Sequence, residues 1–158
     1  MDGAVCGDGA GPRTMVPRIK NVLLASADQV AIDSVAAGLM GFEPMSIPYL
    51  RMAQERGLGC AELKRIELVG DTELAGQNWG FKTRRSFVIW GDQMIRKGPL
   101  RPLKRLLLHS PLMGWAPAAS NLYHDYYWYP RKGSKYVREF MESDWGRLFQ
   151  RYTQGTTA

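Results

Sequence analysis

The apolar and polar positions of the first forty residues predict a strand followed directly by a helix. The run from 20 to 26 is short and rich in valine and leucine, as a buried strand is. Ser26 or Asp28 can cap the following helix, and Gly41 can end it, because glycine readily adopts the left-handed backbone of a helix C-terminus. The apolar residues between these ends recur on one helix face: Ile32, Val35, Ala36 and Leu39.

The pattern continues with a second helix and a further strand. The helix is expected to begin near Ser46, with Pro48 in its first turn, and to stop at Gly57 or Gly59. Its inward-facing residues are Leu50 and Ala53. Residues 65–69 alternate between polar and apolar, which predicts a strand. The order β-α-α-β predicts the α/β class, with a small mixed or parallel sheet covered by helices.

The second half of the chain has a different pattern. Residues 70–82 are polar and contain several glycines, which indicates a connection, and 86–90 are predicted as a strand. Helical spacing returns near the C-terminus, where Ser143 can cap the last helix. Its apolar positions are Val137, Phe140, Met141, Trp145, Leu148, Phe149 and Tyr152. We expect an α/β domain over 1–70 and a helical, basic, aromatic-rich extension over 71–158 that packs on it.

The composition is that of a globular chain. The 158 residues are 45% hydrophobic and 23% charged, which suffices for a packed core. No apolar run is long enough to cross a bilayer, and the first residues do not form a signal peptide, so we expect a soluble, cytoplasmic protein. Cys6 and Cys60 lie far apart without CxxC spacing, so the sequence encodes neither a zinc site nor an iron–sulfur cluster motif.

The net charge of +6 is unevenly distributed. Residues 1–80 contain seven Lys or Arg and ten Asp or Glu, a net charge of −3. Residues 81–158 contain fourteen and five, a net charge of +9. The two halves of the chain therefore differ in kind.

The opening stretch "DGAVCGDGAGPR", residues 2–13, contains four glycines and two aspartates, which predicts a loop. If this loop lies over the start of the first helix, carboxylates and free amides gather there and suit a divalent cation or an anion. The candidate cation ligands are Asp2, Asp8, Asp28 and Asp33, and the candidate anion contacts are Gly9, Gly11 and Ser26. Alternatively, Asp28 only caps the helix, Asp33 lies at the rim and the glycines only shape a turn. Neither a Walker motif nor a GxGxxG fingerprint is present.

Three segments, "DGAVCGDGAGPR", "LLASADQVAIDSVAAGLMGFEP" and "IPYLRMAQERGLG", resemble the C-terminal half of the domain of unknown function 362 family. The family pattern combines an Asp-Gly start, a Gly-x-Gly-Pro loop, a Ser-x-Asp-x-x-Ala-x-Asp helix opening and a Gly-Leu-Gly turn. The matching residues are Asp2, Gly3, Gly9, Gly11, Pro12, Ser26, Asp28, Ala31, Asp33, Gly41, Gly57 and Gly59.

This resemblance implies an α/β domain that forms a metal- or anion-binding part of a redox or metabolic protein, without identifying a substrate or reaction. Family members have a longer N-terminal half, so we expect this chain to be a fragment that partners that half or a ferredoxin-like domain. Many relatives carry ferredoxin-type cysteine runs and are described as iron–sulfur proteins. Because this chain lacks such runs, a divalent cation is the cofactor that we expect.

The aromatic run "NLYHDYYWYPRKG", residues 121–133, has two interpretations. His124 beside Asp125 would form an oriented acid–base pair, with neighbouring tyrosines supplying hydroxyl groups. In a strand, however, adjacent side chains point to opposite faces, and the run would then be structural.

The basic stretch 96–105 has three interpretations: a solvated face, a contact with acidic lipid headgroups, or a contact with a phosphate backbone. No nucleic-acid-binding motif is present, so nucleic acid is not the expected partner. The candidate contact residues are Arg101, Lys104 and Arg105. The alternative function is therefore a non-catalytic interaction module that docks through this basic half on an acidic membrane surface or a protein partner.

Overall fold

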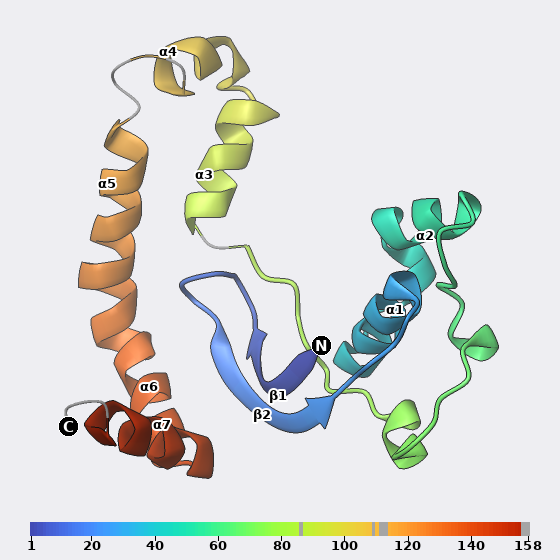
Figure 1. Ribbon diagram of the computed structural model, residues 1–158. Coiled ribbons are helices and arrows are strands. Elements are labelled where there is room, and N and C mark those ends of the chain that lie inside the picture. Colours follow the sequence, from blue (N-terminus) through green and yellow to red (C-terminus); the bar gives the residue numbers. More distant parts are fainter. Residues whose placement is uncertain (86, 109, 111–113, 156–158) are drawn as a thin grey trace. The chain divides into compact units, whose positions relative to one another are not determined.

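The computed structural model describes residues 1–85, 87–108, 110 and 114–155 and divides into two compact units (Figure 1). Unit 1 comprises Met1–Cys6 and Arg18–Lys82, and unit 2 comprises Gly7–Pro17 and Thr83–Ala158. The division in the second half of the chain thus follows Lys82, whereas the sequence pattern places it after residue 70. Among the described residues, no helix is both long and apolar enough to span a membrane.

The fold is mixed and mainly helical, and the sheet of the described residues is a hairpin of β1 (Asp2–Asp8) and β2 (Val16–Leu23). The backbone N–H of Leu24 donates to the Met1 carbonyl at 3.0 Å, and the Met1 amino group donates to the Leu24 carbonyl at 2.6 Å. The coarse expectation of a mixed α and β fold is confirmed. The expectation of a parallel or mixed sheet is wrong, because the connection is too short for the crossover that parallel strands require.

The opening stretch is mostly a strand, not the predicted loop. Glycine and aspartate are poor strand formers, which is why composition alone indicates a loop. Pairing with β2, a strand that contains valine, isoleucine and leucine, outweighs this local preference. Only the segment after Asp8 turns, beginning with Gly9 at a φ of 105°.

Helix α1 (Gln29–Met40) confirms the sequence prediction at both ends. Asp28 is the N-cap, and Gly41 is the C-cap with a left-handed φ of 97°. The Gly41 N–H donates to the Gly38 carbonyl at 2.9 Å, which satisfies a carbonyl that the end of the helix leaves open.

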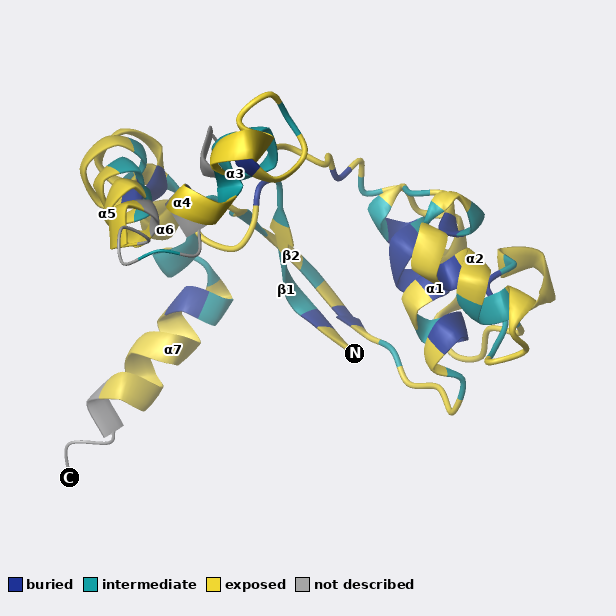
Figure 2. Ribbon diagram, turned by 90° about the horizontal axis from the view of Figure 1, so that it is seen from above, coloured by how far each residue is buried: buried dark blue, intermediate teal, exposed yellow. Residues whose placement is uncertain are grey.

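The core of unit 1 lies on two sides of α1. On one side, Val30 and Ala37 pack with Leu50 and Ala61. On the other side, the cluster consists of Val22 from β2 with Val35 and Leu39. In Figure 2 the buried residues of this unit gather on α1 and its neighbours. The helix is therefore the central element of unit 1.

The segment after α1 confirms the predicted helix and contradicts the predicted strand. A 3-10 turn, η1 (Pro44–Ser46), precedes α2 (Pro48–Glu55), which has Pro48 in its first turn and Leu50 buried. Residues 65–69 form no strand: the 3-10 turn η2 (Leu63–Arg65) leads into irregular backbone before η3 (Thr72–Gly76). Ile66 packs against the core, but Val69 is exposed, and no strand among the residues that the structure describes lies beside it.

Apart from the tip of the hairpin, the described residues of unit 2 are mainly helical. Its elements are α3 (Phe87–Arg96), η4 (Arg101–Leu103), α4 (Lys104–Leu108), α5 (Trp115–Asn121), the π-helix η6 (Leu122–Gly133), α6 (Ser134–Met141) and α7 (Asp144–Gly155). The predicted C-terminal helices are confirmed, and the Ser143 hydroxyl accepts a hydrogen bond from the Gly146 N–H at 3.2 Å, as expected of a cap.

The predicted strand at 86–90 is wrong for its described residues, 87–90, which begin α3. A short apolar run does not distinguish a strand from a buried helix. Here the run continues into residues that suit a helix: Ile95 is buried, and Asp92 pairs with Arg96 one turn later at 2.8 Å. Residue 86 lies outside the described residues.

Candidate functional site

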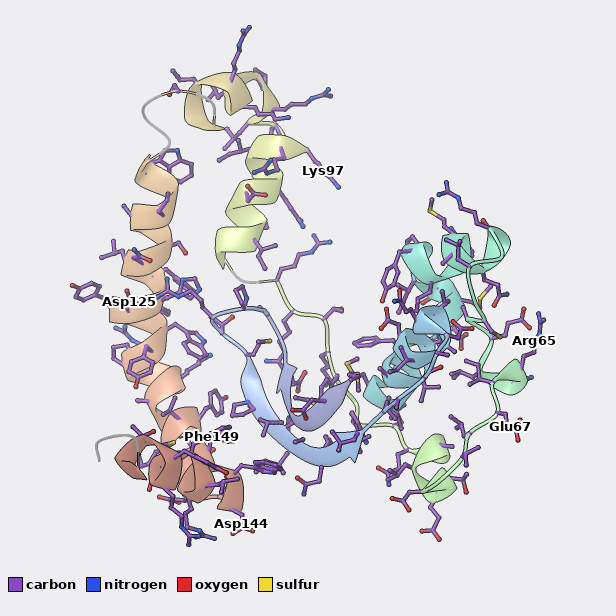
Figure 3. The ribbon with its side chains drawn as sticks, in the orientation of Figure 1. Arg65, Glu67, Lys97, Asp125, Asp144 and Phe149 are labelled. Atoms are coloured by element: carbon purple, nitrogen blue, oxygen red, sulfur yellow. The ribbon has the colours of Figure 1, made fainter. Side chains whose placement is uncertain are left out.

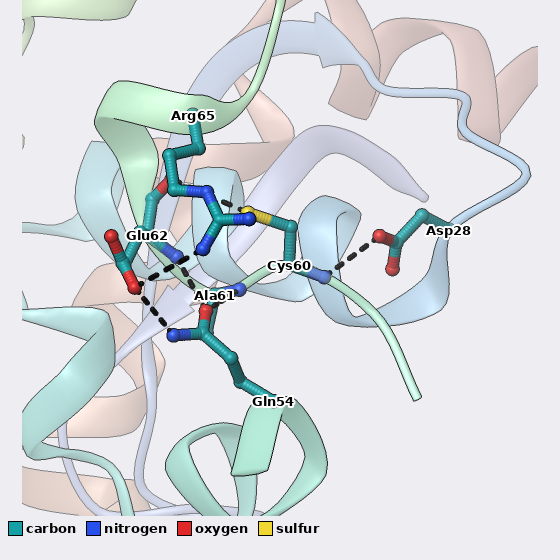
Figure 4. A network of polar contacts seen from close by, with 6 residues as sticks. All are labelled: Asp28, Gln54, Cys60, Ala61, Glu62 and Arg65. Carbon is teal, nitrogen blue, oxygen red and sulfur yellow. Dashed lines mark hydrogen bonds and ion pairs between the residues drawn. The ribbon is translucent and has the colours of Figure 1, made fainter. Parts of the chain in front are cut away.

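Asp28 lies where the resemblance places a ligand, and three backbone amides occupy its carboxylate. Oδ1 accepts from the N–H groups of Val30 at 2.8 Å and Ala31 at 2.9 Å. Oδ2 accepts from the Cys60 N–H at 2.8 Å (Figure 4). Hydrogen bonds from Ala31 and then Cys60 hold the pKa of Asp28 below its ordinary value. The carboxylate therefore joins the start of α1 to the segment after α2.

Gly59 of the Gly-Leu-Gly turn lies directly against this carboxylate. A Cβ added to Gly59 would collide with Asp28 Oδ1 and would lie 2.8 Å from the Cβ of Val30. Glycine is therefore required here for space. The helix opening and the glycine turn, which are distant in the sequence, form one interlocking structure.

A second set of polar contacts holds the segment 60–62 against α2 (Figure 4). Gln54 Oε1 accepts from the backbone N–H of Ala61 at 2.6 Å and of Glu62 at 3.1 Å, and its amide Nε2 donates to Glu62 Oε1 at 2.6 Å. Arg65 pairs with Glu62 at 3.6 Å. Gln54 was not predicted from the sequence, because no local pattern marks a side chain that binds the backbone seven residues away.

Ser26 and Asp33 also have local partners. The Ser26 hydroxyl accepts from the Asp28 N–H at 3.0 Å. Asp33 accepts a hydrogen bond from the Tyr49 hydroxyl, and partial burial together with the Asp33 charge raises the pKa of Tyr49. These contacts link α1 with its own N-terminal approach and with α2.

The predicted residues of the opening stretch divide between the two units. Asp2 belongs to unit 1 and accepts from the Ala4 N–H at 2.8 Å. Asp8, Gly9 and Gly11 belong to the hairpin tip in unit 2. Within the described ranges, no three His, Cys, Asp or Glu side chains form a group that could hold a metal ion. A metal site at the four aspartates thus stays a prediction, with no group of three to support it.

The predicted acid–base pair of the aromatic run does not form, because its two members have other partners. His124 is buried on η6, and its Nδ1 donates to the Ser120 carbonyl at 2.6 Å. Asp125, labelled in Figure 3, pairs with Arg13 of the hairpin tip, whose Nη2 lies 2.6 Å from Oδ1. Arg13 also donates to Asn121 Oδ1 at 2.8 Å. The run is a helix, so neighbouring side chains point in different directions.

Residues 96–106, which we call the cationic segment, form an exposed surface around η4 and α4. Exposed leucines alternate with basic residues: Leu100, Arg101, Leu103, Lys104, Arg105 and Leu106. Figure 3 shows Lys97 and the side chains around α4 extending away from the ribbon. Arg96 pairs with Asp92, but Arg101, Lys104 and Arg105 form no ion pair with another described residue. The segment thus combines unneutralised positive charge with apolar area in water.

Comparisons with protein-family models, with curated proteins and with solved structures gave no match for this chain.

Proposed function

We propose that this protein is a non-catalytic interaction module that docks on an acidic membrane surface through the cationic segment. The observation that carries this proposal is the alternation of exposed leucines with basic residues that have no acidic partner among the described residues. Leucines such as Leu106, which is 53% exposed, lose contact with water on entering the boundary of the acyl chains, while the neighbouring cations meet lipid phosphates.

The charge of the surrounding sequence supports the proposal. Residues 93–138 contain nine Lys or Arg and a single acid, Asp125, which is paired with Arg13. A juxtamembrane cation contributes about 1 kcal/mol to binding of an anionic bilayer. A cytoplasmic location, which the sequence favours, would place the segment beside the anionic leaflet of the membrane.

Co-sedimentation with lipid vesicles tests the proposal. Vesicles that contain phosphatidylserine should bind the protein, and vesicles of phosphatidylcholine alone should not. Because about 1 kcal/mol corresponds to about fivefold in binding, the triple variant Arg101→Glu, Lys104→Glu, Arg105→Glu should show no measurable binding. Circular dichroism establishes that the variant is folded.

The matched control is Arg51→Glu, Arg56→Glu, Lys64→Glu, which changes the net charge equally on exposed residues of unit 1. It should bind nearly as well as the wild type. Equal loss in both triple variants, or wild-type protein that ignores phosphatidylserine, would refute docking through the cationic segment.

We also propose that the chain belongs to the family that it resembles, in a metal- or anion-binding part of a redox or metabolic protein. The support is structural: the motif residues Asp28, Gly41 and Gly59 each have a defined task, as helix cap, left-handed helix end and close contact. The partner would then be an N-terminal half or a ferredoxin-like domain.

Thermal unfolding in the presence of Mg²⁺, Mn²⁺ or phosphate tests the ligand role of Asp2 and Asp8. Binding to the folded state raises Tm, and Asp2→Asn with Asp8→Asn should abolish the rise for the cations. No shift at millimolar concentrations would count against this second function.

A further inference from the structure

The π-helix η6 exposes large apolar and amphipathic side chains. Leu122, Tyr126 and Tyr127 are exposed and lie four or five residues apart, about one π-helical turn, so they share one side of the helix. We call this surface the tyrosine face. Tyr126 is 75% exposed and Leu122 is 64% exposed. Exposure of a leucine on the same side as two tyrosines leaves one side of the helix largely apolar but edged with hydroxyl groups.

A ladder of stacked side chains holds one member of the tyrosine face in place. The Tyr123 and Tyr127 rings stack with centroids 5.6 Å apart, and the Arg131 guanidinium lies 4.3 Å from the centroid of the Tyr127 ring. Arg131 Nη1 also donates to the Tyr127 carbonyl at 3.3 Å. The ladder fixes a cation at the edge of the face, with further N–H groups to donate.

We propose that the tyrosine face is a second membrane contact, which inserts among the headgroups of an anionic bilayer while Arg131 contacts a lipid phosphate. This inference rests on the proposed membrane docking and extends it to η6. Tyrosine suits this depth because its ring leaves water while its hydroxyl group stays among polar headgroups. Lys132 is exposed and adds positive charge next to the face, whereas the charge of Lys135 is offset by its ion pair with Glu139 at 3.7 Å.

Arg13 acts as a positioning residue for this contact. Asp125 lies on η6 between Leu122 and Tyr126, and its carboxylate would repel lipid phosphates if it were unpaired. The 2.6 Å ion pair with Arg13 neutralises it, and the hydrogen bond from Arg13 to Asn121 holds the guanidinium in place. Arg13, from the hairpin tip, thereby neutralises the charge of Asp125, the only acidic residue in the 46-residue sequence 93–138.

Vesicle binding at two salt concentrations separates the two contacts. Salt screens the attraction between the cationic segment and the lipid but leaves the transfer of tyrosine rings largely unaffected. The wild type should therefore retain a salt-resistant fraction of binding at 0.5 M NaCl, about five times the low-salt condition of 0.1 M. The variant Leu122→Ser, Tyr126→Ser should lose this fraction and keep the salt-sensitive part.

The control is Leu58→Ser, Tyr152→Ser, which removes an exposed leucine and an exposed tyrosine outside the face and should behave as the wild type. If Leu122→Ser, Tyr126→Ser binds like this control at both salt concentrations, the inference fails while docking through the cationic segment stands. If the wild type does not bind anionic vesicles at all, the proposed function fails first.

The Arg13 role has its own readout. Arg13→Gln should weaken binding to phosphatidylserine vesicles about fivefold, the effect of one uncompensated charge, and the added change Asp125→Asn should restore it. A loss that Asp125→Asn does not restore would refute the charge explanation. Free phosphate or an oligonucleotide that displaces the protein from vesicles at constant ionic strength would show that the site recognises phosphate outside a membrane and would overturn the lipid assignment.

Discussion

Replacement of Gly59 by alanine tests whether the glycine turn is required for space beside the helix cap. The new methyl group would collide with the Asp28 carboxylate and lie 2.8 Å from the Cβ of Val30. Gly59 does not have a positive φ, so alanine brings no backbone strain, and the collision is the whole perturbation.

The sign of the change in the free energy of unfolding shows whether Gly59 lies in a packed site or in an unconstrained one. Forcing a methyl group into a packed site costs about 1–3 kcal/mol in the free energy of unfolding. At an unconstrained site the same change stabilises a protein by about 0.4–1 kcal/mol, because alanine has fewer unfolded conformations than glycine. Gly76 supplies the control: its φ is not positive, and an added Cβ would meet nothing within 4 Å.

Urea unfolding followed by circular dichroism measures both variants. Gly59→Ala should lower the free energy of unfolding by about 1–3 kcal/mol, and Gly76→Ala should not. In a background of Asp28→Ala the cost of Gly59→Ala should shrink, because neighbouring residues that share an interaction are not additive. A Gly59→Ala variant as stable as Gly76→Ala, or a cost unchanged by Asp28→Ala, would refute the reasoning.

Three further predictions concern the core, the cap and a thiol. Leu50→Ala should cost about 2–5 kcal/mol in urea unfolding because Leu50 is only 1% exposed, whereas Leu58→Ala, at a residue 69% exposed, should stay within about 0.5 kcal/mol of the wild type. Because the pKa of Asp28 is lowered from 3.8, its charge stabilises the fold above that pH, and this contribution is lost as the pH falls through the folded-state pKa. The urea midpoint of the wild type should therefore fall more steeply below about pH 4 than that of Asp28→Asn, and parallel curves would contradict this. Burial raises the pKa of Cys6 above its ordinary value of 9.0, so less of the reactive thiolate is present in the folded protein. In a Cys60→Ser variant at pH 8, a disulfide reagent such as DTNB should therefore modify the folded protein more slowly than the urea-unfolded chain. Equal rates in the two states would contradict the raised pKa.

Helix α1 was predictable because its signals are local. Asp28 caps backbone amides two and three residues away, and Gly41 supplies the left-handed end, so neither residue needs the rest of the fold to act. The same holds for Pro48 at the start of α2 and Ser143 before α7. Short-range hydrogen bonds and backbone preferences can be predicted from residues that are close together in the sequence.

Most of the incorrect predictions involve partners that are distant in the chain, whereas the strand predicted at 86–90 failed because a short apolar run also suits a helix. β1 is a strand because β2 pairs with it, and residues 65–69 are not a strand because no strand of the described residues lies beside them. The Cys60 N–H donates to Asp28, which lies 32 residues earlier in the chain. Asp125 pairs with Arg13, 112 residues earlier, and not with the adjacent His124. Adjacency in sequence predicted neither contact, because side-chain direction depends on the helix that carries it.

The hairpin belongs to unit 1 at its open end and to unit 2 at its tip, so the chain passes through the two units alternately. Cleavage of the chain after Lys82 would consequently not yield two autonomous pieces. The N-terminal piece would contain residues 7–17, which belong to unit 2. The helical piece would lack Arg13, and Asp125 would lose its ion-pair partner. Each unit is compact, but no single cut of the chain separates the two. The two pieces would therefore have to be co-expressed so that residues 7–17 can still reach the helical piece.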